Sequence, residues 1–157
     1  MAERAEALAG KFEAVNGDVI ATVEAASDEQ WAAVTSEEGW PVGVVAHHVG
    51  GGYPLLAGLI QGLASGADLP ALTQDMLDQS NAQHATEHAN CTKEETLEML
   101  RTGGVAVSGA VRGLTDDQLD ISKEVLAGAP AMSIEQVIEG ILIGTAVEHL
   151  ASIKKAI

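Results

Sequence analysis

The sequence predicts an all-α protein, a four-helix bundle with an extra helix in the long connection between the second and third bundle helices. Apolar residues recur at spacings of three and four, which places them on one face of a helix. Four segments are preceded by a Ser or Thr with Glu or Gln three positions later, a helix-capping pattern. No stretch alternates apolar and polar residues as a half-buried strand does. We treat residues 1–157 as one domain, because this length can bury a core of its own.

The first bundle helix is expected over residues 3–25. Its apolar face consists of residues at helical spacing: Leu8, Phe12, Val15 and Val19. The pattern SDEQ at residues 27–30 is a capping box that opens a short helical turn around Trp31.

The second bundle helix is expected to begin at Pro41, because the missing N–H of proline needs no partner in the first turn. Its apolar seam is Val45, Val49, Gly52, Leu56, Leu59 and Leu63. The segment ASGADLP at residues 64–70 ends this pattern. A polar, alanine-rich helix over residues 73–89 then lies in the connection.

The third bundle helix follows the capping pattern TKEE at residues 92–95. Its seam is Leu97, Leu100, Gly104, Val107, Val111 and Leu114. The helix also contains several glycines, each of which costs about 1 kcal/mol in a helix interior, and either close helix approach or local fraying would explain them. The pattern TDDQ at 115–118 caps a short piece, and SIEQ at 133–136 starts a closing helix that runs to the chain end.

The charge and composition of the chain argue against several classes of function. The chain carries 23 acidic and 8 basic residues, a net charge of −15, which repels nucleic acid and anionic lipid. The first residues lack the apolar core of a signal peptide, and the longest apolar run, around ILIGTAV, is too short to cross a bilayer. The lone Cys91 excludes an internal disulfide. We therefore expect a cytoplasmic protein with no nucleic-acid partner and no membrane.

Two adjacent histidines in the second bundle helix form the start of a candidate site. His48 borders the apolar seam, so we expect it to point inward and His47 to point outward or to the flank. In the closing helix, Thr145 and His149 share a face with the apolar positions Ile138, Ile141, Leu142 and Ile153. Imidazoles that converge from two helices are how bundles build metal and ligand sites. Taken alone, His48 is more simply interpreted as a core histidine that donates a ring N–H to a backbone carbonyl.

Several motifs resemble those of the DinB-like superfamily of four-helix bundles, which includes the mycothiol-dependent maleylpyruvate isomerase type. In GWPVGVVAHHVGG a tryptophan is followed eight residues later by His48. DQSNAQ is similar to the family's connecting helix, TKEETLEML with GLTDDQLD to its third bundle helix and turn, and GILIGTAVEHLASIKKAI to its closing helix. Together these motifs cover nearly the whole chain.

The resemblance implies a divalent metal, zinc or nickel, and a low-molecular-weight thiol. The family's metal is held by a histidine of the second helix and by two residues of the last helix, four apart, which here are His48, Thr145 and His149. A threonine hydroxyl is a poor ligand. His84 and His88, one turn apart on the connecting helix, are candidate substitutes, or simply polar residues that cover a helix end.

Two functions follow from these residues. One is a metal-dependent thiol transferase or isomerase acting on a small molecule, with a degenerate metal site. The alternative is a non-catalytic bundle that has lost the metal and binds a small ligand or serves a structural role. We also predict a homodimer, because Ile143, Val147 and Leu150 form a second apolar stripe on the closing helix. Cover by the connecting helix or by the chain around Trp31 is the competing explanation of that stripe.

Overall fold

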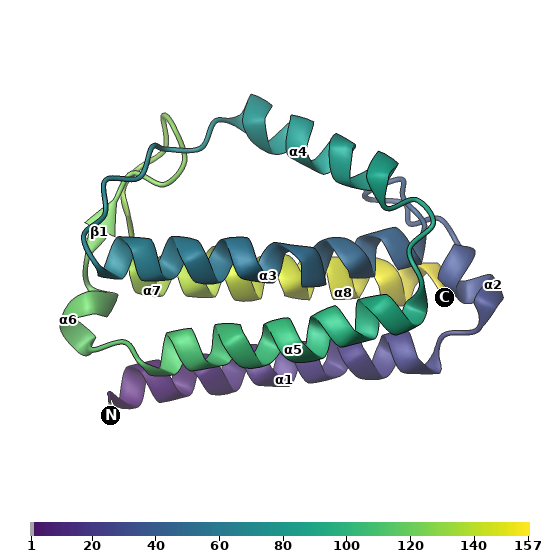
Figure 1. Ribbon diagram of the computed structural model, residues 1–157, viewed down its shortest axis with the longest axis horizontal. Helices are drawn as coiled ribbons and strands as arrows, with labels where there is room; N and C mark the ends of the chain where they lie inside the picture. The colour runs from purple at the N-terminus through teal and green to yellow at the C-terminus, as the bar shows by residue number, and fades with distance from the viewer. Residues whose placement is uncertain (1) are drawn as a thin grey trace.

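The computed structural model describes residues 2–157 and confirms the all-α prediction (Figure 1). The bundle is formed by α1 (Glu3–Ala25), α3 (Val42–Ala64), α5 (Lys93–Arg112) and a continuous closing stretch of α7 (Ile134–Gln136), η1 (Val137–Ile143) and α8 (Gly144–Ala156). Helix α5 packs against both α1 and α3, and α8 packs against the same two helices from the other side. The four helical rods therefore enclose one core.

Short elements connect the rods. They are α2 (Asp28–Ala32), α4 (Gln74–Glu87) and α6 (Asp116–Leu119), with a two-residue antiparallel ladder of β1 (Ser122–Lys123) and β2 (Met132–Ser133). The capping boxes predicted at Ser27, Thr115 and Ser133 are formed, while Thr92 caps α5 through its hydroxyl alone. The ladder was not predicted, because two residues are too few to show an alternating pattern.

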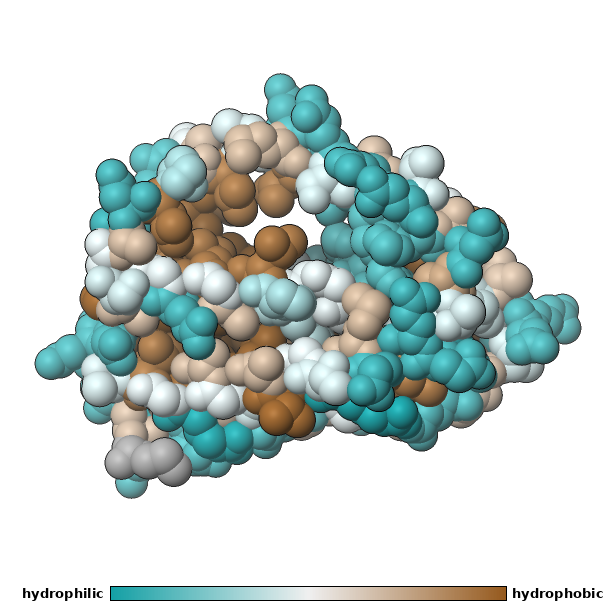
Figure 2. All heavy atoms as spheres, viewed as in Figure 1, coloured by the Kyte–Doolittle hydropathy of each residue, from teal (hydrophilic) through white to brown (hydrophobic). Residues whose placement is uncertain are grey.

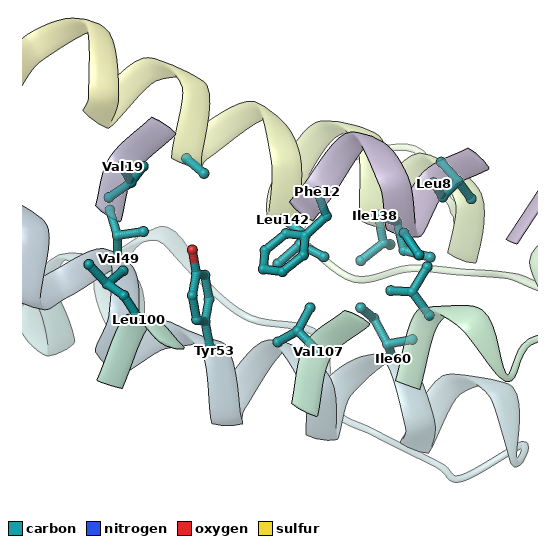
Figure 3. Packing of buried hydrophobic residues seen from close by; sticks show 14 of the residues in the cluster. Leu8, Phe12, Val19, Val49, Tyr53, Ile60, Leu100, Val107, Ile138 and Leu142 are labelled. Carbon is teal, nitrogen blue, oxygen red and sulfur yellow. The ribbon is translucent and has the colours of Figure 1, made fainter. Parts of the chain in front are cut away.

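The core confirms most of the predicted apolar faces (Figure 3). Phe12 of α1 meets Tyr53 of α3 edge to face, with ring centroids 5.2 Å apart. Ile138 and Leu142 enter from the closing stretch and Val107 from α5, and each is fully or almost fully buried. These residues come from all four rods, so their burial holds the rods together.

The glycines of α5 are explained by close packing at two positions. A Cβ on Gly104 would lie 2.2 Å from Asn16 Nδ2, and one on Gly103 would lie 3.1 Å from the Tyr53 ring. By contrast, Gly109 has no such neighbour within 4 Å. Close helix approach, rather than fraying, accounts for Gly103 and Gly104.

The closing stretch differs from the prediction in its register. Its seven-residue η1 segment is a π-helix, whose wider turns rotate the following residues relative to an α-helix. The buried stripe therefore runs through Leu142, Ala146 and Leu150, with Thr145 half-buried beside it. Leu150, which we expected on an outer apolar stripe, is a core residue, so only Val147 of that stripe is well exposed. The stripe is largely covered within one chain, and the homodimer remains a prediction.

The closing stretch is apolar over a greater length than the run around ILIGTAV indicates. Because α7, η1 and α8 are continuous, Ile134–Ala156 is long and apolar enough, by length and composition alone, to cross a membrane. Its residues Ile138, Leu142 and Ile153 are buried against the other rods. Core helices of soluble bundles have the same character.

Helix α4 stands apart from the bundle (Figure 1). None of its residues is fully buried, and among the rods it contacts mainly α3. The chain before α4 is tied down by Leu72, which exchanges backbone hydrogen bonds of 2.8 Å with the segment around Leu126. Figure 2 shows an opening beneath α4 whose rim carries hydrophobic residues.

Candidate functional site

All five histidines of the chain lie in one cluster, where the start of α3 meets the end of α4 and the middle of α8. The His47 and His88 rings are stacked with centroids 4.2 Å apart, and His47 and His84 rings are 5.0 Å apart. His48 lies 5.2 Å from His149 and 5.3 Å from His84, again between ring centroids. The structure thus brings together every histidine that the sequence singled out.

The expected orientation of the adjacent pair is wrong for His47. His47 is 3 % exposed, whereas His48 is only half-buried. The reason is that the start of α3 is covered on almost every side. Trp31 packs so tightly on Gly43 that a Cβ there would lie 2.4 Å from the indole. Helices α4 and α5 cover the side that carries His47.

His48 and His149 do approach each other across the bundle, as predicted. Their environment includes Glu38, from the loop before α3, whose Oε1 atom lies 2.9 Å from His149 Nδ1. Partial burial would raise the pKa of Glu38, yet hydrogen bonds from Ser152 and His149 lower it below its ordinary value. An ionised carboxylate only accepts hydrogen bonds, so His149 Nδ1 carries a proton, and in the neutral form of the ring Nε2 presents a lone pair.

Burial keeps the inner imidazoles neutral at pH 7. It lowers the pKa of His48 and of His84 to about 4, and it also lowers the pKa of His47. Neutral imidazoles are the form that binds metals and accepts hydrogen bonds. Cys91 lies near the cluster, but burial raises its thiol pKa and the Sγ atom donates to the Gly43 carbonyl at 3.3 Å. It is therefore not a thiolate.

Two residues of the site were missed. Glu38 lies in a loop, where no periodicity marks it. The apolar seam of α3 by itself predicts the wrong side for His47. The uninterrupted small and apolar run from Val42 to Ala46 was a signal that this part of α3 is buried on both sides.

Comparison with known proteins identifies the family. A family model described as the mycothiol maleylpyruvate isomerase N-terminal domain matches residues 12–137. The chain belongs to this family. The match confirms the resemblance to DinB-like proteins, and it includes four of the five histidines, while His149 lies beyond its end. No curated protein and no solved structure gives a significant match.

The mycothiol maleylpyruvate isomerase type of DinB-like protein implies a metal held from the second and last bundle helices, and this ligand set fits here only in part. His48 and His149 meet as such a site requires. The third position, Thr145, uses its hydroxyl to donate to the Ile141 carbonyl one turn earlier in its own helix. Two imidazoles alone make an incomplete set for a tightly bound divalent metal.

The candidate substitutes His84 and His88 are brought to the cluster, but on the side of His47. The three imidazoles offer nitrogen atoms that all lie within 4.8 Å of one another. Trp40 borders the other side, with its ring 5.4 Å from that of His48 and 6.2 Å from that of His84. The cluster therefore has two halves, His47 with His84 and His88, and His48 with His149 and Glu38.

Proposed function

We propose that this protein is a thiol-dependent transferase or isomerase that acts on a small molecule at the five-histidine cluster. The observation that carries the proposal is the convergence of all five histidines from α3, α4 and α8. Burying several imidazoles in an otherwise apolar bundle costs desolvation free energy. Helical bundles build their ligand sites from such inward-facing side chains on neighbouring helices. The family name supports a low-molecular-weight thiol such as mycothiol as one reactant.

The pair of Glu38 and His149 supplies the acid–base chemistry that this reaction needs. A thiol is nucleophilic only as its thiolate, so its proton must be removed. The unprotonated Nε2 atom of His149 accepts that proton, and the Glu38 carboxylate at Nδ1 stabilises the imidazolium that results. The thiolate then adds to an electrophilic carbon of the second reactant, a π bond at that carbon breaks, and the His149 imidazolium returns its proton to the atom that receives the electron pair. Ser152 donates a hydrogen bond to Glu38 and holds the carboxylate in place.

The opening beneath α4 supports a small, partly apolar reactant. Hydrophobic residues border part of it (Figure 2). The histidine cluster lies where the end of α4 approaches α3. A reactant in this opening would present its electrophilic carbon toward the imidazoles while its apolar part contacts the rim.

The proposal is tested with untagged protein, mycothiol and maleylpyruvate, and then with a panel of other thiols and electrophiles, by following loss of the electrophile in ultraviolet absorbance. We expect thiol-dependent turnover that falls at least about 100-fold in His149→Gln, as general-base removal does. Glu38→Gln should fall about 10-fold or more, as loss of an orienting partner does. Glu139→Gln, on η1 outside the cluster, is the control. Turnover that His149→Gln leaves intact would overturn the proposed role.

A second candidate is a non-catalytic bundle that binds a small molecule. The use of the Thr145 hydroxyl within its own helix favours it, because the family's third ligand is then missing. Calorimetric binding of mycothiol without any turnover across the panel would support this alternative.

A further inference from the structure

We infer that His47, His84 and His88 form a divalent-metal site of their own, displaced from the position used in the family. The site joins α3 to the last turn of α4 and takes zinc or nickel through three imidazoles. It does not depend on the proposed thiol chemistry, because it is argued from the geometry of these three side chains.

The pair of His47 and His84 buries hydrogen-bonding groups that have no partner. His47 Nδ1 lies 2.8 Å from His84 Nε2, so the two atoms share one proton. The other nitrogens of this pair, His47 Nε2 and His84 Nδ1, are buried without a hydrogen-bond partner. Whichever tautomer is drawn, the pair buries one unpaired N–H and one unpaired lone pair. Unpaired buried groups cost about 1 to 3 kcal/mol each.

A cation between the two rings reduces this cost. If His47 Nδ1 and His84 Nε2 both direct lone pairs to the metal, the proton that they share moves to the unprotonated outer nitrogen, so that both outer nitrogens carry an N–H. His47 Nε2–H then faces the carboxylate of Glu95, which lies 3.8 Å away. A carboxylate behind a metal-bound histidine is the usual second partner of such ligands.

The third ligand, His88, lies beside this pair. His84 and His88 are one helical turn apart, and the His88 ring stacks on that of His47 at 4.2 Å. The nitrogens of all three lie within 4.8 Å. Tetrahedral ligands at about 2.1 Å from zinc are about 3.4 Å apart. Binding therefore requires His47 Nδ1 and His84 Nε2, which lie 2.8 Å apart, to separate by about 0.6 Å, and the widest pair to close by at most about 1.4 Å. Rotation of the half-buried side chain of His88 supplies such a movement.

Space for the ion is available beside Gly51. A Cβ on Gly51 would lie 3.9 Å from both His47 Nδ1 and His84 Nε2 and 3.4 Å from Met99 Cε, so the glycine leaves about the room of a methyl group next to the two coordinating atoms. Nearby charge also favours a cation, since Glu95 faces the site and the net charge of the chain is −15.

The site also gives α4 a means of attachment. This helix buries none of its residues fully, and its polar sequence offers little hydrophobic anchorage. A metal shared between α3 and α4 would fasten the end of α4 over the cluster, next to the opening. Metal binding would thus couple to the position of this helix.

The test measures metal binding alone, without thiol or substrate. Untagged protein is stripped with a chelator and titrated with Zn²⁺ by calorimetry and with Co²⁺ by visible absorption, which reports the ligand number. We expect one ion per chain with the strong absorption of tetrahedral cobalt. Affinity should fall at least about 10- to 100-fold in His84→Ala and in His88→Ala, a loss that outer-shell changes alone already produce. His47→Gln tests the buried ligand with less loss of volume.

The matched controls are His48→Ala and His149→Ala, which remove imidazoles from the other half of the same cluster. Their affinities should stay within about threefold of the unsubstituted chain. A site that is lost in His48→Ala and His149→Ala but kept in His88→Ala would overturn the inference, as would the absence of binding at about 100 μM Zn²⁺, a concentration at which even calcium sensor sites are filled. Circular dichroism of each variant confirms that the bundle is folded. Because no turnover is measured, failure of the metal site is distinguishable from failure of the proposed reaction.

Discussion

Asn16 of α1 and Gly104 of α5 lie so close that a methyl group on the glycine would come within 2.2 Å of the Asn16 Nδ2 atom. Asn16 is a buried polar residue, and both ends of its amide are used. Nδ2 donates to the Leu100 carbonyl at 3.0 Å, while Oδ1 accepts from the Tyr53 hydroxyl at 2.6 Å. The absence of a side chain at Gly104 is what allows this amide to lie between three rods.

We expect Gly104→Ala to destabilise the protein by about 1 to 3 kcal/mol, the usual cost of forcing extra volume into a packed core. The added methyl displaces Asn16 and breaks its two hydrogen bonds, which outweighs the gain of about 1 kcal/mol in helix propensity. Gly109→Ala is the matched control in the same helix, because apart from the adjoining backbone of α5 nothing lies within 4 Å of its Cβ position. Denaturant unfolding should show this control unchanged or stabilised. Equal effects of the two substitutions would contradict the packing explanation.

The bundle itself was predictable from sequence because helical spacing and capping residues are local signals. The capping boxes at Ser27, Thr115 and Ser133 give three helix starts directly. The errors arose where neighbours far along the chain decide the environment. The π-helix η1 rotates the face of α8 and carries Leu150 into the core, and nothing in its sequence marks the wider turns.

The sequence predicted that histidines form the candidate site, but it did not predict which of them lie next to one another. His48 and His149 were paired correctly, since each borders an apolar seam. The burial of His47 depends on α4, whose polar sequence has no seam that would predict where it docks. Glu38 reaches His149 from a loop, and loop geometry is set by the packing around it.

The metal-free protein should lose stability as the pH falls from 7 toward 5. Burial lowers the folded-state pKa of His48 and His84 from 6.5 to about 4, so between these values the unfolded chain binds more protons. The stability they contribute is complete above pH 6.5 and is lost as the pH decreases. We expect a slope on the order of 1 kcal/mol per pH unit after allowance for solvent screening.

Unfolding by urea at pH 7.5, 6.0 and 5.0 in the presence of a chelator measures this slope. The double substitution His48→Gln with His84→Gln should flatten it, because glutamine does not titrate. This range stays above the pH at which most of the many carboxylates are protonated. A slope that the double variant retains would assign the acid sensitivity to other groups.

The homodimer predicted from the closing helix is best tested at Val147, which is 48 % exposed. If the dimer forms through this face, light scattering should give twice the chain mass at low and moderate salt, and Val147→Glu should give the monomer mass. Leu150→Glu would not be informative, because Leu150 is a core residue and its substitution would unfold the bundle. A monomer mass for the unsubstituted chain at both salt concentrations would leave intramolecular cover as the explanation of the apolar stripe.

Metal binding should have its largest dynamic effect on α4. The helix has few buried contacts, so its amide protons are expected to exchange through local opening that leaves the rods intact. When zinc is bound by His47, His84 and His88, α4 can open only if a bond between the metal and a histidine breaks. At a free zinc concentration of 100 times the dissociation constant the stabilisation is about 2.7 kcal/mol, which slows exchange about 100-fold where opening breaks the site.

Hydrogen exchange followed by mass spectrometry measures this effect segment by segment. Zinc should visibly slow exchange in peptides from α4. Peptides from the middle of α1 and α5 open only by global unfolding and already exchange so slowly that no further slowing is seen over the same labelling times. In His88→Ala the zinc effect on α4 should disappear, whereas in His149→Ala it should persist. If zinc instead slowed exchange in α8 and left α4 unaffected, the metal would be bound by the family pair His48 and His149, and α4 would be fixed by hydrogen bonds such as that between His47 and His84.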